Sequence, residues 1–169
     1  VAHAVLKGLD LEAARAMEGV HLVLGSEDLL EAGITRGLDG IAMPNRDGTM
    51  GAMPKRPLLA EGKLRFVGEA IAMVVADSRA IAMDALEAIG VDHDDLPAVM
   101  ELAPSDVAIH DEAPNNRAYD WEIGDAEATE AALNTSAHVV RLQVGDNRII
   151  VNAMEPRGCY AEYAGGRLH

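Results

Sequence analysis

The chain has 169 residues, and its 28 acidic and 14 basic side chains give a formal net charge of −14. This charge argues against nucleic-acid binding, which needs clustered Lys and Arg, and an aromatic content of 3% leaves few platforms for stacking bases. No run of about 18 apolar residues and no signal-peptide pattern is present, so we expect a cytoplasmic chain without a membrane span.

The first third of the chain predicts two strands, each followed by a short helix. "VAHAVLKG" (1–8) and "VHLVLG" (20–25) have the apolar, β-branched character of strands. Asp10 and Ser26 come directly after them, and each is expected to cap the helix that follows.

Residues 33–63 carry no sustained hydrophobic period and are rich in Gly and Pro. This composition predicts a long surface excursion, and loops of this length are usually functional or mobile. Met43, Met50 and Met53 lie within it. Flexible apolar side chains in such a loop indicate either a docking surface or disorder, and the sequence leaves both open.

The clearest unit is a strand, a helix and a second strand. "AIAMVVA" (70–76) is a continuous apolar run, which predicts a strand that is buried on both faces. Asp77 or Ser78 caps the helix expected over 79–89, and "GVDHDDLPAVM" (90–100) returns as a strand with an acidic edge. This order suggests a small α/β layer.

The last part of the chain changes from mixed elements to consecutive strands. Asp125 is expected to cap a helix over 125–133. Three strand-like runs follow, over 137–144, 148–154 and 158–163. The change of pattern places a domain boundary near residue 135, so that 1–134 and 135–169 are predicted to be separate domains.

The final residues predict a hairpin that has only begun. Tyr160–Tyr163 alternate as a strand does, Ala164–Gly166 is a turn signal, and Arg167–His169 would open the returning strand. A chain that stops there leaves a strand edge unpaired. The other end lacks an initiator Met. We therefore expect that both ends are cut and that the chain is a fragment.

Two clusters combine His with carboxylates. They are "DHDD" (92–95) and "IHDEAP" (109–114), where His93 or His110 could ligate a cation. In a strand, however, Asp92 and Asp94 lie on one side while His93 and Asp95 lie on the other, so the four side chains do not converge. Solvated charge that protects a strand edge is the preferred interpretation, and no metal site is predicted.

No catalytic constellation emerges from the residues themselves. Cys159 is the single Cys, so no disulfide framework or iron–sulfur cluster can form within the chain, and its position on a probable strand predicts a small packed side chain. No Ser lies in a Gly-x-Ser-x-Gly setting, and no Gly-rich phosphate loop is present.

Several stretches in order nevertheless resemble one family. "RPLLAEGKLRFVGEAIAMVVADSRAIAMDALEAIGVDHDDLPAVME" (56–101) resembles the core of the α/β hammerhead domain, with Ala70 where that family usually has Pro. This domain opens the molybdenum-binding large subunit of the xanthine dehydrogenase, aldehyde oxidase and carbon monoxide dehydrogenase family. Residues 1–29 resemble its first segment, and "NRIIVNAMEPRGCYAEY" (147–163) resembles the start of the cofactor-binding portion.

The resemblance implies an α+β fold, with a hammerhead domain over 1–134 and the first strands of a truncated molybdopterin-binding domain over 135–169. It implies that the parent enzyme uses a molybdenum-pterin dinucleotide. Such an enzyme inserts water-derived oxygen into an aldehyde, an N-heterocycle or a similar substrate, or oxidises carbon monoxide. None of the family's catalytic segments matches this chain, so no catalytic residue is assigned, and the fragment is expected to bind no cofactor and to be inactive.

Asn152, Glu155 and Arg157 are the candidate cofactor-binding residues, because they lie in the family-like "NAMEPR" segment. The alternative is that Glu155 and Arg157 only order the strand through hydrogen bonds. Iron–sulfur and FAD subunits or domains are the implied partners, in a hetero-oligomer. Two other functions stay open: a stand-alone hammerhead module that binds a partner through residues 33–63, and a small enzyme that uses the carboxylates of 92–95 with a divalent cation.

Overall fold

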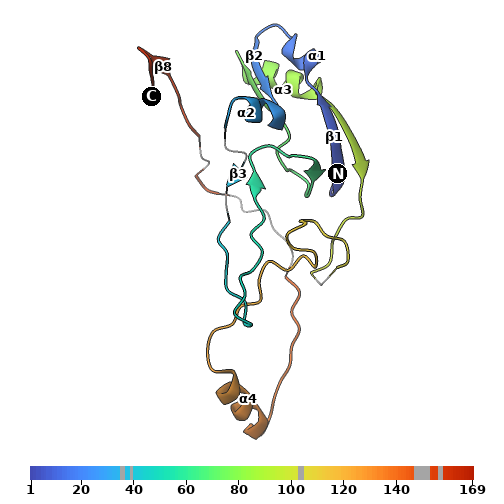
Figure 1. The fold of residues 1–169 in the computed structure, drawn as a ribbon, viewed down its shortest axis with the longest axis vertical. Coiled ribbons are helices and arrows are strands. Elements are labelled where there is room, and N and C mark those ends of the chain that lie inside the picture. The colour runs from blue at the N-terminus through green and yellow to red at the C-terminus, as the bar shows by residue number, and fades with distance from the viewer. Residues whose placement is uncertain (35–36, 39, 103–104, 147–152, 156–157) are drawn as a thin grey trace. The chain divides into compact units, whose positions relative to one another are not determined.

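The chain folds as a mixture of short helices and small sheets, in agreement with the predicted α+β class, and the paired strands are antiparallel (Figure 1). The computed structural model describes residues 1–34, 37–38, 40–102, 105–146, 153–155 and 158–169. It divides into two compact units, Val1–Gly124 and Asp125–His169. These units are defined by compactness, whereas the boundary near residue 135 was predicted from a change in sequence pattern. That boundary therefore stays a prediction.

A three-stranded sheet contains the N-terminal strand at its centre. Strand β1 (Ala4–Asp10) lies between β5 (Lys63–Leu64) and β7 (Gly90–Asp95), and both neighbours are antiparallel to it. The acidic strand β7 is therefore at the edge, where the Lys7 ammonium reaches across to Asp94 at 2.6 Å. This position confirms the interpretation of 92–95 as charge on a solvated strand edge.

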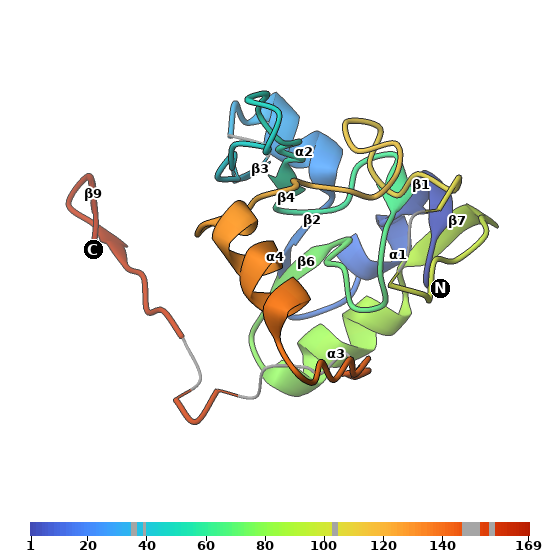
Figure 2. The same cartoon turned by 90° about the horizontal axis from the view of Figure 1, so that it is seen from below.

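A second sheet pairs β2 (Val20–Leu24) with β6 (Met73–Ala76) and carries helices on one side (Figure 2). Helices α1 (Glu12–Arg15) and α3 (Arg79–Glu87) pack against the sheet. Their shared core is small and aliphatic. Its buried members are Leu11, Ala14, Val23 and Ala85.

Two predictions for residues 70–100 need correction. Strands β6 and β7 lie in different sheets, so the strand–helix–strand unit connects two layers instead of building one. Strand β6 is not buried on both faces, because Met73 and Val75 are exposed. The apolar side chains of this run suit a strand that is buried on both faces. In the described part of the chain, however, helices pack against only one face of the sheet.

The predicted helix cap is right at α3, whereas the N-cap residues of α1 and of α2 (Ser26–Glu31) are Leu11 and Gly25 instead of the predicted Asp10 and Ser26. The Ser78 hydroxyl accepts a hydrogen bond from the Ile81 amide at 3.3 Å, as expected for a cap. The Asp10 carboxylate accepts one from the Glu12 amide at 3.1 Å and so supports the start of α1. Ser26 is not a cap: it is the first residue of α2, whose preceding Gly25 amide donates to the Asp28 carboxylate.

The predicted excursion between the two sheets is a structured arm. Strands β3 (Gly37–Leu38) and β4 (Arg56–Pro57) pair at its base, and a bridge between Pro44 and Met50 closes its tip. Met50 and Met53 are exposed on it, as a docking surface would require. After the arm, a second core is formed by Ala4, Ala60 and Leu64.

The second unit has little packing of its own. Helix α4 (Ala126–Thr135) is capped by Asp125, as predicted, and every described residue from 125 to 169 is exposed. The predicted hairpin is confirmed, because β8 (Tyr163–Ala164) and β9 (Arg167–Leu168) pair around Gly165 and Gly166. The strand expected over 137–144 does not form.

The other two expected strands of this unit are only partly accessible to comparison. Most of 148–154 lies outside the described residues, and 158–162 carries no strand. A strand needs a neighbour for its backbone hydrogen bonds, and the described part of this unit supplies one only at the final hairpin. Among the described residues, no helix has the length and apolar character needed to cross a bilayer.

Candidate functional site

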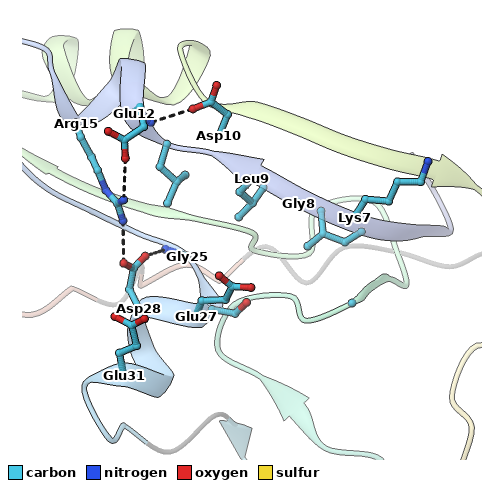
Figure 3. Close-up of a pocket in the computed structure, with 14 residues that line it drawn as sticks. Lys7, Gly8, Leu9, Asp10, Glu12, Arg15, Gly25, Glu27, Asp28 and Glu31 are labelled. Carbon is cyan, nitrogen blue, oxygen red and sulfur yellow. Dashed lines mark hydrogen bonds and ion pairs between the residues drawn. The ribbon is translucent and has the colours of Figure 1, made fainter.

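A depression of about 480 Å³ in the first unit is lined by β1 and by the starts of α1 and α2 (Figure 3). Its charged lining is mainly acidic and consists of Asp10, Glu12, Glu27, Asp28 and Glu31, with Lys7 and Arg15 as the cations. Such a surface could attract cations or a basic partner.

The contacts around Arg15 show that most of this lining has a structural role. The guanidinium donates to the Asp28 carboxylate at 2.8 Å and to the Val23 carbonyl at 3.2 Å, and it lies 3.4 Å from Glu12. Asp28 also accepts from the Gly25 amide at 2.7 Å. These groups join α1, β2 and α2, and no hydrogen-bonded pair of nucleophile and base lies among the residues that line the depression.

A second polar cluster fixes the tip of the arm to residues 117–122. Arg46 donates two hydrogen bonds to the Asp120 carboxylate, at 2.8 and 3.0 Å, and lies 3.5 Å from Glu122. Backbone contacts reinforce this clip: the Arg46 amide donates to the Asp120 carbonyl and the Ala52 amide to the Ala118 carbonyl, at 2.8 and 2.7 Å.

The charges of the clip stabilise each other. Arg46 lowers the pKa of Asp120, chiefly through the hydrogen bonds and secondly through its charge. Asp120 in turn raises the pKa of Arg46. Gly51 is required at the crossing, because a Cβ there would lie 2.4 Å from the Ala118 carbonyl oxygen.

This clip is hard to predict from the sequence, although one signal is present. Acidic Asp120 and Glu122 alternate with Tyr119, Trp121 and Ile123. In an extended segment such alternation places the acidic side chains on one side and the apolar side chains on the other. Arg46 binds the acidic side chains, and the apolar ones are exposed. The partner Arg46, 74 residues away from Asp120, has no local signal at all.

The His-containing clusters do not assemble a metal site. His93 Nδ1 lies 3.3 Å from Asp95, whereas Asp94 is paired with Lys7. Burial, and secondly the charge of Arg65, lower the pKa of His110. Across the described residues, no three His, Cys, Asp or Glu side chains are grouped so that they could hold a metal ion.

A buried polar cluster lies near the start of the chain. His3 Nδ1 is 2.9 Å from the Pro97 carbonyl oxygen, and Glu69 accepts from the Arg65 amide at 2.6 Å. Extending the register of β1 and β5 by one residue places His3 opposite Arg65. His3 Nε2 and Arg65 Nε are buried and have no hydrogen-bond partner within the described structure.

The predicted cofactor-binding residues form no cradle. Asn152 and Arg157 lie outside the described residues, and Glu155 is exposed. Cys159 is exposed as well, so its prediction as a small packed side chain was wrong. A pterin needs enclosing walls with convergent polar groups, and the described residues of the second unit are all exposed. The described residues of the second unit therefore do not fit the cofactor.

Comparison with known families gives two matches, in chain order. Residues 1–97 match the model for the aldehyde oxidase and xanthine dehydrogenase α/β hammerhead domain. Residues 109–169 match the molybdopterin cofactor-binding domain. The chain belongs to the molybdenum hydroxylase large-subunit family. Its first unit is accordingly a hammerhead-type domain, as the resemblance implied.

Individual relatives agree with this assignment. The chain is 34% identical over 172 residues to the nicotine 6-hydroxylase large subunit of Paenarthrobacter nicotinovorans, covering 96% of this chain and 19% of the relative. It is 32% identical over 179 residues to the carbon monoxide dehydrogenase large chain of Hydrogenophaga pseudoflava, covering 96% and 21%. The chain therefore spans about a fifth of the length of these relatives.

Solved structures with the same hammerhead-type arrangement include two enzymes of this family. Carbon monoxide dehydrogenase from Oligotropha carboxidovorans aligns with a TM-score of 0.56 and 28% identity, over 80% of this chain and 18% of that chain. Quinoline 2-oxidoreductase from Pseudomonas putida 86 aligns with a TM-score of 0.51 and 40% identity, over 57% and 12%.

Proposed function

We propose that this chain is the hammerhead part, with the beginning of the cofactor-binding part, of the large subunit of a molybdenum-pterin-dependent oxidoreductase. The observation that carries the proposal is the order of the two family matches, 1–97 and then 109–169, within one short chain. The parent enzyme would use a molybdenum-pterin dinucleotide to oxidise an aldehyde, an N-heterocycle or carbon monoxide.

The role of these residues in the parent is structural. The charged contacts of the first unit join its elements, and the described residues of the second unit present no walls around a cofactor. We therefore propose that the 169-residue chain by itself binds no molybdenum and catalyses no hydroxylation. The pterin, when bound in the parent, would supply the redox chemistry, and the segment around Glu155 would belong to the cofactor-binding portion.

We further propose partners and a boundary for the parent. Two relatives are named a large subunit and a large chain, which favours smaller partner subunits that carry iron–sulfur and FAD groups, in a cytoplasmic complex. The domain boundary is placed near residue 135, where the sequence turns from mixed elements to consecutive strands. The alternative function is a stand-alone hammerhead module that docks a partner through the exposed Met residues of the arm.

One experiment separates the two functions. The reading frame is followed past the codon for His169, and the protein it encodes is purified and assayed for molybdenum and for dye-linked oxidation of aldehydes, N-heterocycles and carbon monoxide. Stoichiometric molybdenum with any of these activities is the expected result, while the 169-residue chain serves as the control without either. A stop codon directly after His169 contradicts the proposal and favours the binding module.

A further inference from the structure

The sheet formed by β2 and β6 has one buried face and one open face. Its register pairs Leu22 with Val75, Val23 with Val74 and Leu24 with Met73. Successive pairs point to opposite faces, so the Val23–Val74 pair faces the helices while the other two pairs share the opposite face. The open face is thus made of four apolar side chains: Leu22, Leu24, Met73 and Val75.

The exposure of these side chains agrees with that alternation. Val23 is only 2% exposed, whereas Leu22, Met73 and Val75 are 44%, 46% and 42% exposed. An antiparallel sheet with one solvated face normally alternates apolar and polar side chains. All four of these paired side chains are apolar, although a quarter of the chain is charged. The open face has the composition of a buried surface.

The rest of the molecule also presents surface that is suited to burial. The chain contains one Trp, three Tyr and one Phe, and all of them are exposed. Large aromatic side chains usually supply much of the area of cores and interfaces. None of the described residues of the second unit, moreover, is buried.

We infer that the open face of the β2–β6 sheet is covered, in the parent large subunit, by the polypeptide beyond the fifth that this chain represents. This inference rests on the proposed function. The occupant is an uncharged, apolar surface of the same polypeptide, which completes a third layer over the sheet. Strand β6 is then buried on both faces, as its apolar sequence predicts.

The size of the open face favours a covalently connected occupant over a second copy of the chain. A stable interface between separate chains buries about 800 Å² and 20–30 residues on each side. Four side chains on two short strands offer much less than that. A domain of the same polypeptide is present at a high effective concentration, so a small apolar contact suffices to hold it in place.

Methionine oxidation provides a test with a matched control. Met73 on the open face and Met83 on α3 are exposed to nearly the same extent, 46% and 48%. With dilute peroxide, the two should oxidise at similar rates in the 169-residue chain, because oxidation follows exposure. In the complete large subunit, Met73 should oxidise at least about tenfold more slowly than in the short chain. Mass spectrometry of the peptides reports each rate.

The contrary results are equally defined. An unchanged Met73 rate in the complete subunit overturns the inference. Slow oxidation of Met73 already in the short chain also overturns it. In that case, a rate that is independent of protein concentration means that the second unit covers the face. A rate that depends on protein concentration means that a second copy covers it. Molybdenum content is measured on the same sample. If the subunit contains molybdenum but Met73 is not protected from oxidation, this inference alone is wrong. If Met73 is protected but molybdenum is absent, the proposed function alone is wrong.

A pair of substitutions adds a second readout. V75K places a charge on the open face, and M83K places one at an equally exposed position on α3. Both should leave the urea midpoint of the short chain nearly unchanged, since both side chains are already exposed to about half. In the complete subunit, V75K should restore fast oxidation of Met73 and M83K should not. Equal effects of the two variants there would contradict the assignment of the face.

Discussion

Single residues in this chain act mainly by joining segments that are distant in the sequence. Arg46 is the clearest case, because its guanidinium and its backbone amide both bind Asp120. Arg15 does the same for α1, β2 and α2 through Asp28 and the Val23 carbonyl. These side chains are partly or fully exposed, so they fix the relative positions of the segments but add little to the free energy of folding.

The Arg46–Asp120 pair has a specific dependence on pH. Arg46 lowers the pKa of Asp120 below its ordinary 3.8, so the contribution of the pair to stability is complete above that value and is lost as the pH falls through the lower folded-state pKa. In a carbon-detected NMR titration, we expect the Asp120 carboxyl midpoint to lie below 3.8 and to rise toward it in R46Q. R117Q should move it less, because Arg117 acts only through its charge. A larger effect of R117Q would contradict the geometry of the clip, in which Arg46 donates the hydrogen bonds to Asp120.

At the scale of elements, the first unit depends on one face of a two-stranded sheet. The β2–β6 sheet buries the Val23 side against α1 and α3 and leaves the Val75 side open. Because the helices are short and their core is largely Ala and Leu, each larger buried side chain contributes a substantial part of the stability.

A pair of matched truncations tests this asymmetry in the 169-residue chain. V23A removes buried methyl groups and should lower the free energy of unfolding by roughly 2 kcal/mol, from lost burial and the remaining cavity. V75A removes the same groups on the open face and should cost about 0.5 kcal/mol or less, as expected for a surface position. Urea denaturation measures both. If V75A costs as much as V23A, the open face is already covered in the short chain.

The strands and helices of the first unit were largely predictable because their signals are local. Periodicity and capping residues located β1, β2, β6 and α3, and the Gly165–Gly166 turn located the last hairpin. Which strands pair, by contrast, depends on contacts far apart in sequence, so β6 and β7 were wrongly expected in one layer. Ser26 shows a local failure, since Asp28 satisfies the Gly25 amide and leaves Ser26 inside the helix.

The candidate cofactor-binding residues could be predicted only from the resemblance to a family. Nothing in the pattern of residues marks Asn152, Glu155 or Arg157 as cofactor ligands, and this expectation came from resemblance alone. The clip between Arg46 and Asp120 and the open face of β2–β6 both depend on how distant segments meet. The alternation of acidic and apolar residues over 119–123 was a weak hint of the clip. The apolar run of β6 was a hint of the open face, because the run has more apolar side chains than the described part of this chain buries.

At the scale of the whole molecule, the two units should differ strongly in their resistance to proteolysis. The first unit contains both buried cores, whereas all described residues of the second are exposed. Helix α4 has ten residues and none of them is buried, and isolated helices of that length are marginal in water. Local opening should therefore be frequent after residue 124 and rare before it.

Limited trypsin digestion can measure this difference. Cleavage needs a segment to open, and Arg141 lies in the second unit on an extended, exposed stretch. Lys63 and Arg65 are internal controls, because their side chains are only 22% and 20% exposed and both lie beside the buried Leu64. We expect a product ending at Arg141 to accumulate well before cuts at the two controls, as mass spectrometry of a time course would show. Simultaneous cleavage at all three sites would mean that the hammerhead unit is not stable in the short chain.

In the complete large subunit the order of cleavage should change, because the stretch around Arg141 would then belong to a packed domain and Arg141 would become resistant to trypsin.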